Sequence, residues 1–74
     1  MPKLPSVSPQ KLAKALEKAG FILERTTGSH FVYYHPQTGR KAVVPIHSRD
    51  IPKGTLCRLL KEAGIDREEL GDLL

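Results

Sequence analysis

Residues 21–45 contain three short β-prone segments separated by turns of only a few residues. Phe21–Arg25 is mostly apolar, His30–His35 contains the sequence Phe-Val-Tyr-Tyr, and Arg40–Pro45 contains Ala-Val-Val. Such residues favour strands, whereas the Thr-Thr-Gly and Pro-Gln-Thr-Gly sequences between them are typical of turns. Connections this short join antiparallel neighbours. The sequence therefore predicts a three-stranded antiparallel meander.

A helical repeat precedes the strands, over residues 9–19. Ser8 is a favourable N-cap, Pro9 occupies the first helical position, where its missing N–H costs nothing, and Gly20 can end the helix in a left-handed conformation. Residues 1–7, which include two prolines, are expected to be extended. The apolar stripe recurs at i, i+3, i+4 and i+7 and consists of Leu12, Ala15, Leu16 and Ala19.

Two more helices are expected after the strands. The first is predicted to begin near Pro52, with Ser48 or Asp50 as its N-cap, and it should end at Gly64. A short last helix is expected over residues 66–74, because an Asp-Arg-Glu-Glu sequence opens this segment with the pattern of a capping box. The apolar stripes of the two helices consist of Leu56, Leu59, Leu60 and Ala63, and of Leu70, Leu73 and Leu74.

These elements predict one small domain over residues 1–74, of the α+β class and with the order α-β-β-β-α. Each long helix must bury its apolar stripe, so both helices are expected to cover the same face of the sheet. The result is a two-layer sandwich whose second sheet face is open. Side chains alternate along a strand, and we expect Phe31 and Tyr33 to face the helices.

Size and charge narrow the range of functions. The chain has 74 residues and a single cysteine, Cys57, so no intrachain disulfide forms and the fold depends on packing. No apolar segment reaches the ~18–20 residues that span a bilayer. The first residues lack the pattern of a signal peptide, so we expect a cytoplasmic protein with no membrane partner. With 12 Lys and Arg against 8 Asp and Glu the formal charge is +4, which favours an anionic partner such as nucleic acid.

Three histidines are the main candidates for chemistry: His30, His35 and His47. Each alone is more commonly a surface or structural residue, although imidazole can act as an acid or a base near neutral pH. His30 and His35 are an odd number of positions apart along a strand and should project to opposite faces, which argues against joint metal ligation. We expect the side chains of Ser29 and His30 to diverge, so a Ser–His nucleophile is not predicted. No metal and no cofactor is predicted.

One histidine in a basic setting is enough for one kind of chemistry. RNA carries its own nucleophile, the 2′-hydroxyl group beside the scissile phosphate. A histidine can remove the proton of that hydroxyl or protonate the leaving 5′-oxygen, while Lys or Arg side chains stabilise the negative charge on the phosphate. Cleavage of RNA without a metal is therefore a hypothesis that these residues allow.

The triplet Gly28-Ser29-His30, followed directly by Phe-Val-Tyr-Tyr-His-Pro, resembles the signature of the HicA (YcfA-like) toxin family. Further motifs match on both sides of the triplet and in the same order, so that the similarity spans about residues 4–70. These further segments are Leu12–Phe21 with Arg25, Val44–His47 and Gly54–Ile65.

The resemblance implies a fold like that of a double-stranded-RNA-binding domain. It also implies the activity of a ribosome-independent mRNA endonuclease, an mRNA interferase, from a type II toxin–antitoxin pair. His30 would be the catalytic residue, no cofactor would be needed, and a HicB-type antitoxin would neutralise the enzyme by covering that site. Family members commonly have a basic residue just before the glycine, and here that position holds Thr27. Arg25, Arg40 and Lys41 are candidates to compensate.

The expected RNA contacts lie near the triplet and at the start of the second long helix, where a helix N-terminus favours phosphate. Two alternatives stay open: a non-catalytic RNA-binding module on the same fold, and a protein-interaction domain that uses the open sheet face and Tyr34. The candidate RNA-binding residues are Gly28, Ser29, Arg25, Lys41 and Lys53.

Overall fold

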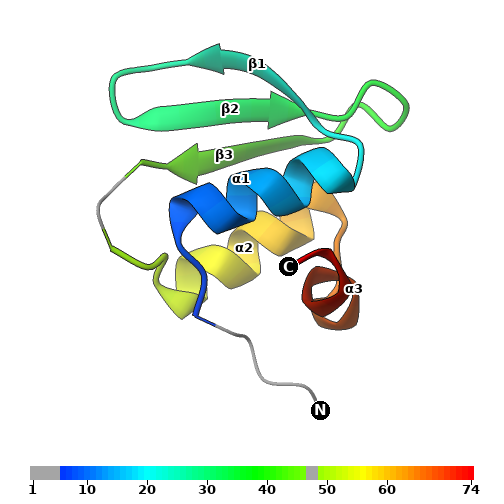
Figure 1. Ribbon diagram of the computed structural model, residues 1–74. Coiled ribbons are helices and arrows are strands. Elements are labelled where there is room, and N and C mark those ends of the chain that lie inside the picture. Colours follow the sequence, from blue (N-terminus) through cyan, green and yellow to red (C-terminus); the bar gives the residue numbers. More distant parts are fainter. Residues whose placement is uncertain (1–5, 47–48) are drawn as a thin grey trace.

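The computed structural model describes residues 6–46 and 49–74. Helices and strands follow one another in the predicted order, α-β-β-β-α with a further short helix at the end (Figure 1). Two of the residues considered above, His47 and Ser48, lie outside the described residues. The elements are α1 (Pro9–Lys18), β1 (Ile22–Thr26), β2 (His30–Tyr34), β3 (Lys41–Pro45), α2 (Lys53–Ala63) and α3 (Arg67–Leu73).

The three strands form the predicted antiparallel meander, with β2 in the centre and β1 and β3 at the edges. Between β2 and β3 the register is regular and pairs His30 with Pro45. Between β1 and β2 the register shifts between Leu23 and Arg25, which marks a bulge in β1. A bulge twists an edge strand and thereby makes it a poorer template for pairing with another chain.

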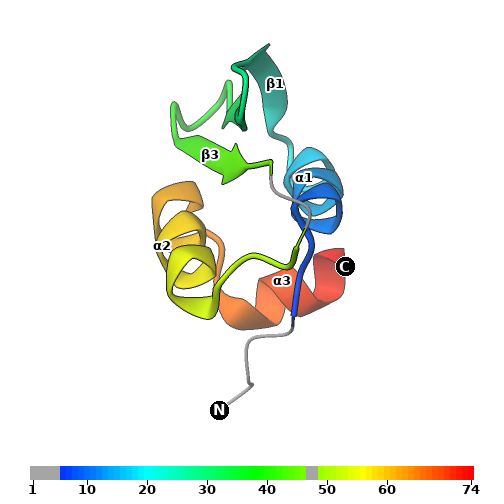
Figure 2. The ribbon, with the colours of Figure 1, turned by 90° about the vertical axis from the view of Figure 1, so that its left-hand side faces the viewer.

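Both long helices lie on the same side of the sheet, as predicted, and the opposite face carries no helix (Figures 1 and 2). α3 adds to the expected two layers, because it lies below α1 and α2 on the side away from the sheet (Figure 2). Its Leu70 is fully buried and belongs to the same core as the two long helices. The last helix, predicted over residues 66–74, ends one residue earlier, at Leu73, and Leu74 is exposed.

The ends of α1 are formed as predicted. The Ser8 hydroxyl accepts a hydrogen bond from the Lys11 backbone N–H at 3.2 Å, and Pro9 opens the helix. Gly20 follows the last turn with a φ of +100°, a conformation that residues with a side chain rarely adopt. At the other end of the sequence, Asp66 caps α3 by accepting the Glu69 N–H at 2.7 Å.

α2 begins near Pro52, as predicted, but Asp50 does not cap it. Its N-cap is Pro52, with no side-chain cap hydrogen bond, and Asp50 lies two residues earlier. A proline disfavours helical conformation in the residue before it, so Ile51 stays extended and Asp50 is too far from the first helical N–H groups to cap them. Gly64 ends the helix with a φ of +75°, as predicted.

The core lies between the sheet and the helices. Tyr33 is buried there and Phe31 is packed against it, which confirms the predicted orientation of β2. Burial raises the pKa of the Tyr33 phenol, and the nearby Glu17 carboxylate on α1 adds to this shift. Val7 is also fully buried, and its carbonyl accepts the Ile51 N–H at 2.8 Å, so the chain before α1 joins the core.

Candidate active site at the hairpin that carries His30

His30 is the first residue of β2 and follows a hairpin turn whose central residues are Gly28 and Ser29. The Thr27 N–H donates to the His30 carbonyl at 2.8 Å, and the Thr27 hydroxyl donates to the same oxygen at 3.3 Å. On the other side, the Ile46 N–H donates to the Ser29 carbonyl at 2.7 Å. The backbone that carries His30 is thus held from both neighbouring strands. The side chain itself is half-buried.

The hydroxyl of Ser29 lies 2.9 Å from Nδ1 of His30. The expectation that these two side chains diverge is therefore wrong. It applied the alternation of a strand to both residues, whereas Ser29 belongs to the turn and only His30 belongs to β2. Since a hydroxyl can donate or accept, Ser29 can pair with either tautomer of the imidazole. With Nδ1 occupied in this way, Nε2 is the ring nitrogen left to exchange a proton with a substrate.

His30 also lines a surface cavity of about 350 Å³ that lies between the edge strand β3 and the helix α2. The sequence did not reveal this feature, because it depends on how α2 packs beside β3. One signal was present: Thr55, Arg58 and Glu62 are spaced i, i+3 and i+7 and share one side of the helix. The lining residues are His30, Val43, Pro45, Thr55, Arg58, Leu59 and Glu62.

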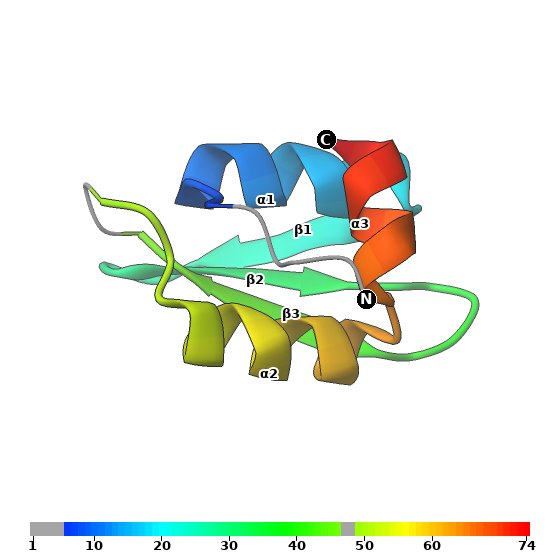
Figure 3. The ribbon, with the colours of Figure 1, turned by 90° about the horizontal axis from the view of Figure 1, so that it is seen from below.

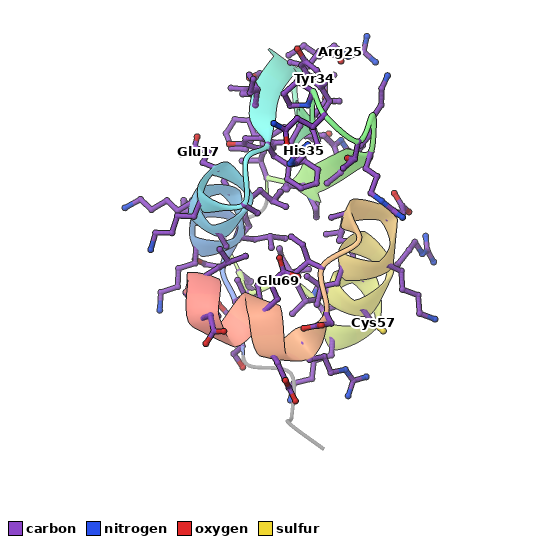
Figure 4. The ribbon with its side chains drawn as sticks, turned by 90° about the vertical axis from the view of Figure 1, so that its right-hand side faces the viewer. Glu17, Arg25, Tyr34, His35, Cys57 and Glu69 are labelled. Atoms are coloured by element: carbon purple, nitrogen blue, oxygen red, sulfur yellow. The ribbon has the colours of Figure 1, made fainter. Side chains whose placement is uncertain are left out.

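Besides Ser29, two of the predicted RNA contacts, Arg25 and Gly28, lie close to His30. Arg25 pairs with Val32 in the sheet, and His30 is two positions from Val32 in β2, so Arg25 and His30 share the open face as diagonal neighbours. Figure 4 shows Arg25 projecting away from the helices. Gly28 has no atom within 4 Å of where a Cβ would stand, and its φ is not positive. Nothing in the fold itself therefore requires a glycine at position 28.

Lys41 and Arg40 lie at the other end of the sheet. Lys41 pairs with Tyr34, four residues along β2 from His30, which corresponds to ~13 Å at the usual rise of a strand. The Arg40 guanidinium donates to the Glu62 carbonyl near the end of α2, at 3.4 Å. The structure does not bring either residue to His30, so neither takes the place of the basic residue that Thr27 replaces. Lys41 stays a predicted contact for a different part of an RNA strand.

Lys53 is the first residue of α2 and is exposed. The helix begins at the end of the sheet where β2 begins and β3 ends, as two perpendicular views show (Figures 1 and 3). Thr55, two residues after Lys53, lines the cavity with His30. Lys53 therefore lies at the end of the molecule that carries His30, although it does not line the cavity.

His35 has a structural role. Its Nδ1 accepts the backbone N–H groups of Gln37 and Thr38 at 3.2 and 3.3 Å, which orders the turn between β2 and β3. Its ring meets that of Phe21 edge to face, with the centroids 5.1 Å apart. In Figure 4, His35 lies nearer the helices than Tyr34 does. His30 therefore begins β2, whereas His35 directly follows the other end of this strand.

Within residues 6–46 and 49–74, no three His, Cys, Asp or Glu side chains are grouped so that they could hold a metal ion. In the same part of the chain, no helix has the length and the apolar character needed to cross a membrane.

A comparison with protein families gives one match. The profile of the family described as "HicA toxin of bacterial toxin-antitoxin" matches residues 9–65, from the first residue of α1 to just beyond the end of α2. The match includes the hairpin with Gly28, Ser29 and His30. No curated protein that was compared with the chain matches it. Since the family profile covers most of the 74 residues, the chain belongs to the HicA toxin family of bacterial toxin–antitoxin systems.

Proposed function

We propose that this toxin is an mRNA endoribonuclease of a type II toxin–antitoxin pair and that it cleaves RNA without a metal, with His30 as its catalytic residue. The observation that carries the proposal is the contact of 2.9 Å between Ser29 and Nδ1 of His30, at a hairpin end beside an open cavity. The family supports a toxin role. The α-β-β-β-α order, which is also that of double-stranded-RNA-binding domains, supports an RNA substrate.

The proposed reaction is an internal transfer of the phosphate. The 2′-oxygen of one nucleotide attacks the neighbouring phosphorus, the bond to the 5′-oxygen of the next nucleotide breaks, and a 2′,3′-cyclic phosphate and a free 5′-hydroxyl result. One proton leaves the 2′-hydroxyl and one joins the 5′-oxygen. Nε2 of His30 accepts the first or donates the second. Ser29 supports both states, because its hydroxyl donates to an unprotonated Nδ1 or accepts from a protonated one.

The charge of the chain suits a phosphate backbone. Arg25 shares the open sheet face with His30, and Lys53 lies at the same end of the molecule. With a formal charge of +4, the protein attracts RNA at a distance. Binding should weaken steeply with salt, because each neutralised phosphate releases counterions.

The second proposed partner is an antitoxin of the HicB type. The family implies an antitoxin, and masking the catalytic residue is the simplest way to silence a small enzyme. His30 is accessible for such a contact, because it is only half-buried at a hairpin end. An mRNA substrate and an antitoxin of this kind would both support a cytoplasmic location.

The test uses the purified protein, a long single-stranded RNA and an excess of chelator. Wild type should cleave the RNA and leave 2′,3′-cyclic phosphate ends, whereas His30→Gln, which keeps a polar side chain of similar length, should be inactive. A Gln37→Ala variant is the matched control, since only the backbone N–H of Gln37 makes a contact. Binding without cleavage by wild type would indicate a non-catalytic RNA-binding module. Neither binding nor cleavage would leave only a protein-interaction domain.

A further inference from the structure

The cavity beside His30 is lined by a cationic side chain, that of Arg58, which has no role yet in the proposed reaction. We infer that Arg58 on α2 binds the phosphate group on which His30 acts. This inference rests on the proposed function and adds to it the subsite for the scissile phosphate. It assigns Arg58 as a catalytic residue.

The packing of α2 directs Arg58 towards the edge of the sheet. Leu59, the next residue, is 6% exposed and anchors this side of the helix in the core. Residues spaced i, i+3, i+4 and i+7 share one side of a helix, so Thr55, Arg58 and Glu62 project beside the anchored Leu59. All four line the cavity. The rotation of α2 is therefore set by its buried stripe, and the polar side chains next to that stripe face the site.

The sheet contributes the opposite wall of the cavity. His30 pairs with Pro45 across the last two strands, and Val43 lies two residues before Pro45 on the same face. β3 is an edge strand, so no further strand separates these residues from α2. Val43 and Pro45 are short and carry no charge. Among the residues that the structure describes, the ionisable groups that line the cavity are His30, Arg58 and Glu62.

The chemistry of these groups fits a phosphodiester. A guanidinium group can donate two parallel hydrogen bonds to phosphate oxygens, and it keeps its charge at every pH at which the protein is folded. Placed beside the phosphorus, it stabilises the extra negative charge that develops when the 2′-oxygen attacks. The Thr55 hydroxyl adds a neutral donor to the same cavity.

A cavity of about 350 Å³ has more room than one phosphate group needs, so it also admits part of a ribose. The apolar surfaces of Val43, Pro45 and Leu59 suit a sugar ring better than a second phosphate. The cavity should therefore accept the 3′-phosphorylated nucleotide on one side of the scissile bond.

The first test compares Arg58→Gln with Lys61→Gln in the RNA cleavage assay. Both variants remove one positive charge from an exposed position of α2, but Lys61 does not line the cavity. We expect kcat/KM to fall about 10- to 100-fold for Arg58→Gln, the usual effect of losing a hydrogen bond to a charged group. Lys61→Gln should retain wild-type activity within about twofold, and Arg58→Lys should recover part of the loss. Equal activities of Arg58→Gln and Lys61→Gln would show that Arg58 is an ordinary solvated cation on the helix and would overturn the inference.

The second test does not depend on cleavage. Uridine 3′-monophosphate is titrated into the protein while the Cε1–H signal of His30 is followed by NMR. Wild type and Lys61→Gln should show a saturable shift, and Arg58→Gln should bind at least about fivefold more weakly. No shift in wild type, or the same affinity in all three proteins, overturns the inference. If wild type fails to cleave RNA, the proposed function falls, and this titration alone still decides whether the cavity binds phosphate.

Discussion

The hydroxyl of Ser29 and Nδ1 of His30 lie 2.9 Å apart, although the two residues are neighbours in the chain. The contact is possible because the turn ends between them: Ser29 still has the conformation of the hairpin loop, and His30 is already in β2. The Ile46 N–H donates a hydrogen bond of 2.7 Å to the Ser29 carbonyl and so holds this residue in place. The sheet thus positions the serine that in turn orients the histidine.

Ser29→Ala should therefore slow RNA cleavage without unfolding the protein. The imidazole would lose the hydrogen bond that orients Nε2, and we expect kcat to fall about 2- to 10-fold, the usual effect of one neutral hydrogen bond. Ser29→Thr should recover most of the activity because it keeps the hydroxyl. Cleavage rates over a range of pH check this, since a change in His30 also alters the pH profile. A Ser29→Ala enzyme with an unchanged rate and profile would show that the contact is not used.

Gly28→Ala should separate the needs of the fold from those of the substrate. A Cβ at position 28 meets no atom within 4 Å and the φ is not positive, so the free energy of unfolding should change by less than about 0.5 kcal/mol. If RNA approaches the backbone of this turn, the added methyl group weakens RNA binding. Urea unfolding measures the stability of the variant. A gel shift measures its RNA binding, with Gly28→Ala combined with the inactive His30→Gln so that the RNA is not cleaved.

Gly39→Ala is the matched control for this variant, because it changes a glycine in the other hairpin turn. Gly39 has a φ of +75°, and an alanine there costs about 1–2 kcal/mol of stability. At a temperature where the variant is folded, RNA binding should be unaffected, since the turn is at the other end of β2. Weaker binding by Gly39→Ala together with normal binding by Gly28→Ala would contradict the proposed RNA surface. It would show that RNA binds near the turn with Gly39 and not near the turn with Gly28.

Gly20→Ala should be among the most destabilising small changes in the protein. The backbone at Gly20 has a φ of +100°, and a Cβ there would lie 2.9 Å from Nε2 of His35, whose ring is held by Phe21 and by the turn after β2. We expect the free energy of unfolding to fall by about 2–3 kcal/mol, because the backbone would be strained and the His35 ring displaced. Thermal unfolding checks this.

Gly71→Ala provides the comparison for Gly20→Ala. Gly71 lies within α3, and a Cβ at this position meets nothing within 4 Å. Alanine is a better helix former than glycine, so the free energy of unfolding of this variant should be about 0.5–1 kcal/mol higher than that of wild type. If both alanine variants had the same melting temperature, the close approach of His35 to Gly20 would not exist in solution.

Most of the fold could be predicted because its signals are local. Each signal depends on a few neighbouring residues. These signals are the change of the apolar period from about 3.6 to 2, Ser8 at the start of α1, and Gly20 and Gly64 at the ends of the long helices. The start of α2 near Pro52 was predicted too, but its cap was not. Asp50 is a good capping residue by type, yet Pro52 is the N-cap and Asp50 lies two residues before it.

The site could be predicted only in part, because its parts meet through tertiary packing. His30 was found from its chemistry and from the motif around it. The contact with Ser29 depends on the dihedral angles of one turn residue, and alternation along a strand could not provide them. Arg58 reaches the site only because Leu59 fixes the rotation of α2 against β3. The lysine at position 41 was a reasonable candidate by charge, but the register pairs it with Tyr34, at the wrong end of β2 for His30.

Tyr33 should make the protein sensitive to alkaline pH. Burial, with the Glu17 charge and a weak hydrogen bond to it as further causes, raises the pKa of the Tyr33 phenol in the folded protein. The folded state then binds this proton more tightly than the unfolded state does. Its contribution to stability is fully present below the unfolded pKa, about 10, and is lost as the pH rises through the folded pKa.

Tyr33→Phe should therefore lose less stability than wild type between pH 9 and 11, about the range in which an unfolded tyrosine titrates. Both proteins contain the same other ionisable residues, so the difference between the two curves isolates Tyr33. Tyr34→Phe is the control, because Tyr34 lies on the open face of the sheet and should follow the wild-type curve. The free energy of unfolding in urea, measured at several pH values, gives the slopes. Parallel curves for wild type and Tyr33→Phe would mean that the phenol titrates equally in the folded and unfolded states.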